Sequence, residues 1–390
     1  MIEKQRMTEY VMDLIKIDSL SRREREVGLK LRKDIEEIGA KCFFDDAGKI
    51  VQGNIGNLIA KIRGNEPDSN PILLSAHMDT VEPGEGIKPQ IKDGIIKSDG
   101  TTILGSDDKS GLAIIVEVLR TLKEKNTPHG DIEIAFTICE EIGLLGAKHI
   151  DISNLRSKDG IVLDSGSPSS SPASLVTKCP SAEKLEFIVH GLEAHAGVCP
   201  ERGMNAIKIA SEAIANMKLG RIDAETTANI GIIEGGLAIN IVPNYAHIKG
   251  EARSHSEEKL RAQIEHMRKC FHDAVARYEI TLEGRTYIAK VEETIDRSYE
   301  KMDVSNESKV VKLINQAVKN LGINLKTRAS GGGCDANYFN KKGIECVNLG
   351  TGMKEIHTVN EYLALEEFYQ AADILLETIR LNALISPASH

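Results

Sequence analysis

Apolar residues in the first part of the chain recur with two different periods. Residues 7–17 and 24–38 carry them at helical spacing, and Gly39 follows the second segment as a stop signal. Short apolar runs of strand length alternate with a further helical segment at 112–122. The expected strands lie at 57–62, 71–76, 132–138 and 160–163. Strands that alternate with helices in this way favour an α/β fold with a mostly parallel sheet flanked by helices.

The pattern changes after a stretch rich in serine and proline at 165–174. The next elements follow the order strand, helix, strand, strand, helix, strand. We expect them at 182–190, 203–217, 227–233, 245–253, 256–278 and 280–289. This βαββαβ order is typical of a small α+β domain of the ferredoxin-like kind.

A charged stretch at 291–305 separates this segment from further helical and strand patterns at 310–321, 346–349 and 363–381. The simplest interpretation is one α/β domain that is interrupted in sequence by a second domain. We therefore predict a discontinuous α/β domain of residues 1–177 and 295–390, and an inserted domain of residues 178–294.

Composition narrows the functional classes. The 390 residues include 49 Lys and Arg against 58 Asp and Glu, a net charge of −9, whereas nucleic-acid binders and membrane-surface proteins need concentrated positive charge. No apolar run reaches the ~18–20 residues that span a bilayer, and the first residues contain no apolar signal segment. The seven cysteines are scattered and are expected to be reduced thiols. We expect a cytoplasmic protein that binds neither nucleic acid nor membrane.

Histidines and acidic residues gather where the expected strands end. They are His77 and Asp79 after the strand at 71–76, Asp107 and Asp108 before the helix at 112–122, Glu140 and Glu141 after the strand at 132–138, Asp164 after the strand at 160–163, and His357 after the strand at 346–349. Ligands of open α/β sheets bind beyond the carboxyl ends of the strands. We therefore expect these side chains to meet in one site.

Charge indicates what that site holds. Carboxylates that are packed together repel one another and cannot all stay ionised unless cations neutralise them. Imidazole and carboxylate groups form a natural ligand set for zinc, cobalt or manganese. Our hypothesis is that Asp107 bridges two divalent metal ions, one of which also takes His77 and Asp164. The other also takes Glu141 and His357, and a hydroxide between the two metals is the nucleophile.

The remaining acidic residues have natural roles beside this ligand set. Asp79 lies two residues beyond His77 and can accept from its free ring N–H, which fixes the tautomer. Glu140 lies beside Glu141 and can take the proton of the water and pass it to the leaving amine. Each piece alone also has an ordinary explanation as a helix cap or a solvated surface. Their shared position at strand ends favours the functional interpretation.

The same segments, in the same order, resemble the motifs of a di-zinc metallopeptidase family that includes peptidase T, carboxypeptidase G and aminoacylase. The matching segments are 77–81 (His-Met-Asp-Thr-Val), 105–111 (Gly-Ser-Asp-Asp-Lys-Ser-Gly), 140–143 (Glu-Glu-Ile-Gly), 164–166 (Asp-Ser-Gly), 191–197 (Gly-Leu-Glu-Ala-His-Ala-Gly), 201–206 (Glu-Arg-Gly-Met-Asn-Ala), 240–243 (Asn-Ile-Val-Pro) and 356–361 (Ile-His-Thr-Val-Asn-Glu). The resemblance covers nearly the whole chain and is strongest for the peptidase T-like branch.

The resemblance implies a di-zinc catalytic domain with an inserted lid domain that commonly mediates dimerisation. It implies the metal-ligand roles given above, with Asp107 rather than Asp108 as the bridge. It also implies that His195 of the lid reaches toward the substrate carbonyl, often in the neighbouring subunit, and stabilises the oxyanion. Asn240 and Arg253 resemble the lid residues of the family that hold the substrate, and a guanidinium suits a peptide carboxylate.

A glycine-rich segment at 330–337 (Ser-Gly-Gly-Gly-Cys-Asp-Ala-Asn) resembles the substrate loop of the family. The resemblance implies that its backbone N–H groups, at Gly332 for example, face the ligand. Cys334 stands where serine or threonine is usual, so a hydroxyl contact is not expected at that point. The segment lacks the Gly-Lys-Ser/Thr ending of a phosphate-binding loop.

The resulting hypothesis is a dimeric di-metal hydrolase, with zinc or else cobalt or manganese, that cleaves amide bonds of short peptides as a tripeptide aminopeptidase. A dipeptidase, a carboxypeptidase and an N-acyl amino acid amidohydrolase share this metal site and remain alternatives. A non-catalytic binding protein is opposed by the complete ligand set together with Glu140. A serine nucleophile is opposed because Ser165 lacks the Gly-x-Ser-x-Gly setting.

Overall fold

A computed structural model describes residues 2–166, 174–324 and 326–384 of the chain. Contacts between residues divide the chain into two compact units, which are described separately below. The first unit consists of Met1–Cys179, Met302–Ser330 and Cys334–His390, and the second unit consists of Pro180–Lys301 and Gly331–Gly333. The stretch rich in serine and proline, which we expected between two domains, lies mainly at 167–173, outside the described residues.

The first unit is built around a mixed sheet in the order β1-β2-β6-β3-β7-β18-β8-β16, with β17 also beside β8. Its strands are β1 (Lys41–Phe44), β2 (Leu58–Ile62), β3 (Ile72–His77), β6 (Ile132–Thr137), β7 (Asp159–Ser165), β8 (Ser174–Cys179), β16 (Met302–Asp303), β17 (Lys326–Ala329) and β18 (Glu345–Gly350). The central strands β6, β3, β7 and β18 run parallel, whereas β1 and β2 run antiparallel at one edge. Every residue of β3 and β6 is buried, as expected for strands covered on both faces.

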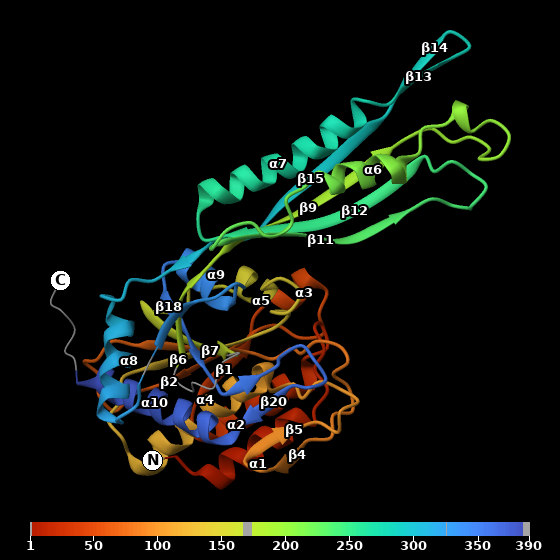
Figure 1. The fold of residues 1–390 in the computed structure, drawn as a ribbon. Helices are drawn as coiled ribbons and strands as arrows, with labels where there is room; N and C mark the ends of the chain where they lie inside the picture. The colour runs from red at the N-terminus through yellow and green to blue at the C-terminus, as the bar shows by residue number, and fades with distance from the viewer. Residues whose placement is uncertain (1, 167–173, 325, 385–390) are drawn as a thin grey trace. The chain divides into compact units, whose positions relative to one another are not determined.

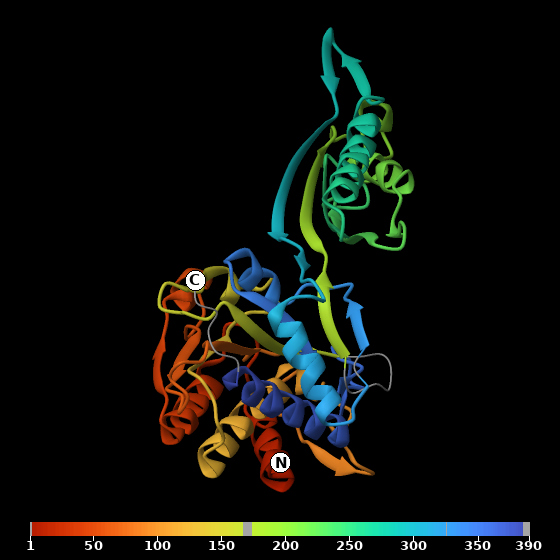
Figure 2. The ribbon, with the colours of Figure 1, turned by 90° about the vertical axis from the view of Figure 1, so that its left-hand side faces the viewer.

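Helices flank this sheet, as Figures 1 and 2 show. They are α1 (Lys4–Ile15), α2 (Arg25–Ile38), α3 (Ala47–Val51), α4 (Ser106–Lys125), α5 (Leu145–His149), α8 (Lys309–Asn320), α9 (Asp335–Lys341) and α10 (Leu365–Ala383). A small sheet in the order β19-β20-β5-β4 adjoins α4, with strands Met353–Lys354, Tyr362–Ala364, Ile95–Lys97 and Gln90–Lys92. The α/β prediction with a mostly parallel central sheet is confirmed. No helix among the described residues is long and apolar enough to cross a lipid bilayer.

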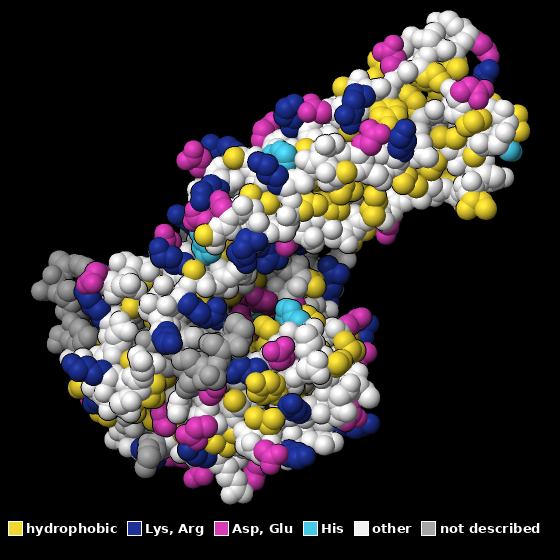
Figure 3. Space-filling model, viewed as in Figure 1, with side chains coloured by type: hydrophobic (Ala, Val, Ile, Leu, Met, Phe, Trp, Pro, Cys, Tyr) yellow, Lys and Arg dark blue, Asp and Glu magenta, His cyan; other side chains and the backbone are white. Residues whose placement is uncertain are grey.

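The second unit is an antiparallel sheet in the order β10-β11-β12-β9-β15. Its elements are β9 (Ser181–His190), η1 (Pro200–Arg202), α6 (Ala206–Ala215), β10 (Gly220–Arg221), β11 (Thr226–Gly235), β12 (Tyr245–Ser254), α7 (Glu257–Val275), β13 (Glu279–Leu282), β14 (Arg285–Ile288) and β15 (Lys290–Tyr299). Apolar side chains also gather on the surface of this unit (Figure 3), where Val198 is 77% exposed, Leu237 86% and Ile239 105%.

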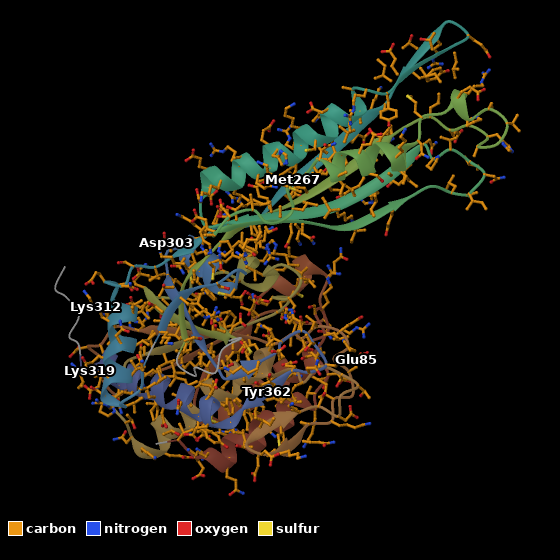
Figure 4. All side chains as sticks on the ribbon, viewed as in Figure 1. Glu85, Met267, Asp303, Lys312, Lys319 and Tyr362 are labelled. Carbon is orange, nitrogen blue, oxygen red and sulfur yellow. The ribbon has the colours of Figure 1, made fainter. Side chains whose placement is uncertain are left out.

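A helix-covered core holds the second unit together. The rings of Phe187 on β9 and Phe271 on α7 stack with their centroids 4.1 Å apart. Met267, which Figure 4 labels on α7, is buried in the same core cluster. The strands β9, β11, β12 and β15 with helices α6 and α7 reproduce the expected βαββαβ order.

The last strand of this unit was placed wrongly by the sequence pattern. Residues 280–289 form a separate hairpin of β13 and β14, which turns at Glu283 (φ 53°) and Gly284 (φ 80°). The sheet is instead completed by β15, which lies in the stretch taken to be a charged connection. As an edge strand, β15 alternates exposed polar residues with half-buried ones, among which Val291 and Ile295 pack against the core. The second unit therefore continues to Lys301, beyond the expected boundary at 294.

Candidate active site

The predicted site residues of the first unit lie at the ends of its central parallel strands. His77 is the last residue of β3, Asp164 is next to last in β7, and Glu140 and Glu141 follow β6. Parallel pairing of β3 with β6 puts His77 level with Thr137, three positions before Glu140. The other predicted residues come from the start of α4 (Asp107) and from the segment after β19 (His357). This is the edge at which open α/β sheets bind ligands.

Asp107 lies between the two histidines. Its Oδ1 is 3.0 Å from Nε2 of His77, and its Oδ2 is 3.3 Å from Nε2 of His357. Each carboxylate oxygen thus faces a different imidazole nitrogen. This is the arrangement that a bridging carboxylate requires when two cations share it.

A further carboxylate accompanies each histidine. Nε2 of His77 is 3.8 Å from Oδ1 of Asp164, and Nε2 of His357 is 3.0 Å from Oε1 of Glu141. Within each of the two triads, which share Asp107, the ligand atoms lie within 4.8 Å of one another. A third grouping that meets this distance joins His77, Glu140 and Glu141. The donor set of imidazole nitrogen and carboxylate oxygen suits zinc, cobalt or manganese.

Asp108 is turned away from this cluster by the backbone. Neither Asp107 (ψ 102°) nor Asp108 (φ −120°) has helical dihedral angles, so the two adjacent side chains leave the chain in different directions. The buried carboxylate of Asp108 accepts from the backbone N–H groups of His77 and Gly111, at 3.1 Å in both cases. A Cβ atom on Gly111 would lie 2.2 Å from the carbonyl oxygen of Leu163, so glycine is required where α4 approaches β7.

Two residues without the freedom of glycine adopt left-handed backbone conformations at the site. Cys139, which precedes Glu140, has φ 53°, and His357 itself has φ 63°. Such conformations cost about 1–3 kcal/mol each and persist where the surrounding structure enforces them. Glu24 provides part of that enforcement, because its buried carboxylate accepts from the backbone N–H of Cys139 at 3.1 Å.

The site's carboxyl groups are strongly coupled. Burial, together with repulsion from Asp107, raises the pKa of Glu141 and raises that of Asp164 well above its ordinary range. Burial opposes ionisation of Asp107 too, but hydrogen bonds with His357 and His77 hold its pKa below the ordinary value. Hydrogen bonds with Asp107 and Glu141 raise the pKa of His357 to about 10. A cluster with this much buried negative charge fits divalent cations, which would relieve the repulsion.

Asp79 lies beside His77 with both its backbone oxygen and its side chain. Nδ1 of His77 lies 2.9 Å from the backbone oxygen of Asp79 and 3.5 Å from its carboxylate Oδ1. The carboxylate instead accepts from the backbone N–H groups of Glu140 (2.9 Å) and Glu141 (3.2 Å), and from the hydroxyl of Ser21 (2.6 Å). The nearer acceptor for the imidazole is thus the carbonyl, while the side chain of Asp79 fixes the segment that carries both glutamates.

Asn348 holds a candidate ligand in place, and the motifs of the sequence did not indicate it. Its Oδ1 accepts from the backbone N–H of Asp164 at 2.9 Å, and its Nδ2 donates to the backbone oxygen of Asp164 at 2.8 Å. The side chain therefore holds the backbone on both sides of this candidate ligand. A buried amide inside the apolar run of β18 was the available signal, because such a group needs partners.

His195 lies in the second unit, in an exposed loop between β9 and α6. Its Nδ1 accepts from the backbone N–H groups of Gly197 and Val198, at 3.2 Å in both cases. The neutral imidazole therefore carries its hydrogen on Nε2, where it can donate to an oxygen. The backbone oxygen of Asn240 accepts from the N–H of Ala196 at 2.9 Å, which joins the loop of His195 to that of Asn240.

Arg253 and Gly332 are neighbours in the second unit. A Cβ atom on Gly332 would lie 3.6 Å from Nη1 of Arg253. Glu251 already pairs with this guanidinium, at 3.0 Å from Nη2. The next residue, Gly333, donates its N–H to the hydroxyl of Tyr299 at 3.1 Å, and a Cβ atom there would lie 2.5 Å from the tyrosine ring. The loop thus needs glycine at 333 in order to lie against Tyr299.

Comparisons with known proteins identify the family of the chain. The model of peptidase family M20/M25/M40 matches residues 73–381. The chain is 41% identical to the aminopeptidase PepT of Bacillus cereus, with 98% of this chain and 100% of that one covered and a TM-score of 0.85. It is 36% identical to a tripeptidase of Staphylococcus aureus, with 99% and 100% covered and a TM-score of 0.91. It is also 27% identical to peptidase T of Fusobacterium nucleatum over 97% of each chain. The chain therefore belongs to peptidase family M20/M25/M40 and is a metallopeptidase.

Proposed function

We propose that this protein is a dinuclear zinc aminopeptidase that releases the N-terminal residue of tripeptides. The observation that carries the proposal is the position of Asp107, which faces His77 with one oxygen and His357 with the other. The preference for tripeptides is supported by the similarity to an aminopeptidase PepT and to a tripeptidase. In this proposal Asp164 and Glu141 complete the two ligand sets around Asp107.

Glu140 is the proposed general base and acid. When bound, two divalent cations supply a Lewis acid that polarises the peptide carbonyl and lowers the pKa of water. Burial, followed by repulsion from Glu141, Asp335 and Asp79, raises the pKa of Glu140 well above its usual range. A carboxylate with a raised pKa is a stronger base, so Glu140 can accept a proton from water and deliver it to the leaving amine.

The proposed substrate contacts come from the second unit. His195 has its Nε2–H free to donate to the oxygen of the scissile carbonyl as negative charge develops there. Arg253 and the backbone N–H groups around Gly332 are proposed to hold the far end of the peptide, where its carboxylate competes with Glu251 for the guanidinium. Asn240 is proposed to contact the substrate from the adjoining loop.

We also propose a homodimer that forms through the second unit. The loops that carry His195 and Asn240 leave Val198, Leu237 and Ile239 more than three-quarters exposed, and β11 leaves Ile232 and Ile233 about half exposed. Apolar patches of this kind are typical of surfaces that another protein covers. Among the described residues, β10 pairs with β11 only at Thr227 and Ala228, so the remaining edge of β11 is proposed to be open to a second copy. A cytoplasmic location is proposed as well, and fits the seven unpaired cysteines.

A panel of four substrates tests the proposed specificity. We expect hydrolysis of Leu-Gly-Gly to be faster than that of Leu-Gly, of N-acetyl-Leu-Gly-Gly and of acetyl-leucine. The released products, separated by chromatography, should be leucine and Gly-Gly. Cleavage of the blocked substrates with an inert free tripeptide would contradict an aminopeptidase and favour an amidohydrolase or a carboxypeptidase.

Metal binding should be accompanied by the release of protons, and metal removal by their uptake. Chelation is expected to abolish activity, and zinc is expected to restore it. Because the pKa of His357 is about 10 without metal, its imidazole is protonated at pH 7, whereas a metal-bound histidine is neutral. Zinc binding should therefore release at least about one proton per chain, and zinc affinity should rise with pH.

Calorimetry measures this release. Zinc is titrated into the metal-free protein at pH 7 in two buffers that differ in ionisation enthalpy, and the difference in binding enthalpy gives the number of protons. His357→Ala should reduce this number together with the metal stoichiometry. A binding enthalpy that is the same in both buffers would contradict the role of His357 as a ligand.

A further inference from the structure

The backbone that leads into Asp107 is wrapped around one buried carboxylate, that of Glu361. Oε2 of Glu361 accepts from the backbone N–H groups of Leu104 and Gly105, at 2.9 Å in both cases. Its Oε1 accepts from the hydroxyl of Ser106 at 2.6 Å and from the backbone N–H of Asp107 at 3.1 Å. Glu361 is 1% exposed, so these four donors replace water as its partners.

The arrangement favours a carboxylate over an amide at position 361. Three of the four partners are backbone N–H groups, which can only donate, and each oxygen accepts from at least one of them, so an amide NH₂ in place of either oxygen would face an N–H group. Burial raises the pKa of Glu361 and lowers that of Lys109 to about 7; Asp107 repels the carboxylate of Glu361, and Lys109 attracts it when its amine is protonated. Hydrogen bonds from several N–H groups stabilise a buried carboxylate strongly.

Glu361 also links two parts of the proposed metal site. It lies four positions after His357, whereas its partners at 104–107 lie more than 250 residues earlier in the sequence. One segment therefore carries both a proposed metal ligand, His357, and the group that holds the bridging Asp107. The position of Asp107 between the two histidines depends on the backbone at 104–107, which departs from helical dihedral angles at Gly105 and Asp107.

We propose that Glu361 is a positioning residue for the metal site, which sets the place of Asp107 relative to His357 and so allows two cations to bind together. This inference rests on the proposed dinuclear function. Glu361 touches neither the proposed metals nor the substrate, and it acts only through the backbone and the hydroxyl of residues 104–107. Groups that orient metal ligands in this way typically change metal affinity by 10–100-fold when they are mutated.

A matched pair of serine variants tests the inference. Ser106 donates to Glu361 at 2.6 Å, and Ser157 donates to Glu133, another buried glutamate of the same unit, at 2.7 Å. Glu133 also accepts from the backbone N–H groups of Arg156 and Ser157, so both serines belong to similar networks. Ser106→Ala and Ser157→Ala should therefore lower thermal stability by similar amounts, but only Ser106→Ala should weaken zinc binding, by about 3- to 10-fold.

Competition with a chelator of known zinc affinity measures binding directly, without reference to activity. In the same measurement Glu361→Gln, which presents an NH₂ group to N–H or O–H donors, should lose 10- to 100-fold in zinc affinity. Glu133→Gln should bind zinc as the unaltered protein does. Ser106→Ala keeps the test informative where the Glu361→Gln protein does not fold.

Two outcomes separate this inference from the proposed function. If the unaltered protein binds fewer than two zinc ions, the dinuclear function fails whatever the variants do. The inference is overturned if the unaltered protein binds two ions and the variants Ser106→Ala and Glu361→Gln bind them as tightly as their respective controls, Ser157→Ala and Glu133→Gln. Glu361 would then have only a structural role.

Discussion

Replacing Glu140 by glutamine is expected to lower kcat by about 10²- to 10⁴-fold while the protein still binds two metal ions per chain. Glutamine has nearly the same shape as glutamate but cannot accept a proton. Glu140 lies outside the two triads that share Asp107, so its replacement should leave the metal affinity nearly unchanged. Steady-state kinetics on a tripeptide and metal analysis of the same preparation measure the two effects together.

The control for this variant is another buried glutamate in the first unit. Glu117 on α4 is also buried and pairs with Arg6 at 2.8 Å, so Glu117→Gln removes a charge of the same kind away from the site. It should reduce thermal stability but not kcat. A Glu140→Gln protein that loses one metal ion would instead favour the third grouping, in which Glu140 is a ligand together with His77 and Glu141. A Glu140→Gln protein with full activity would show that Glu140 is not the general base.

For the first unit, the alternation of helical and strand periods was sufficient to predict strands β2, β3, β6, β7 and β18, whereas β1, β8, β16 and β17 were not predicted. Its central strands are buried on both faces and therefore appear as short apolar runs between amphipathic helices. The strand β15 was not predictable in the same way. An edge strand with one face in water needs few apolar residues, and here Val291 and Ile295 were hidden among charged neighbours.

The candidate ligands could be predicted because they share a position in the fold. Parallel strands end at His77, next to Asp164 and shortly before Glu140 and Glu141. The carboxyl ends of such strands lie at one edge of the sheet regardless of the conformation of the loops. The groups that hold them were harder to predict. Asp79 and Glu361 act on backbone N–H groups, and a sequence pattern does not show where loop amides point.

A polar residue within an apolar segment was the remaining sequence signal. Asn348 interrupts the apolar run of β18, and a buried amide there implied a specific partner, which proves to be the backbone of Asp164. For Glu361 the only signal was its place in the segment that matches the family motif after His357. Neither signal identifies the partner without the three-dimensional structure.

Replacing His195 by alanine is expected to lower kcat by about 10²- to 10³-fold with little change in KM. The effect falls on kcat because the oxyanion that His195 is proposed to stabilise exists only in the transition state. The hydrogen bonds that the backbone N–H groups of Gly197 and Val198 donate to Nδ1 of His195 favour the tautomer in which Nε2 carries the hydrogen and can donate. His272 on α7 provides the control, because it too is an exposed histidine of the second unit, and His272→Ala should leave kcat unchanged.

Mixing two inactive variants tests whether His195 acts in the neighbouring subunit. When His195→Ala and Glu140→Gln chains are produced together, half of the dimers contain one chain of each kind. In such a dimer one of the two sites receives an intact Glu140 from one chain and an intact His195 from the other. The mixture should therefore recover roughly a quarter of the unaltered activity, although each variant alone has almost none. Sedimentation of the mixture establishes that dimers are present, and dimers without recovered activity would mean that His195 acts within its own chain.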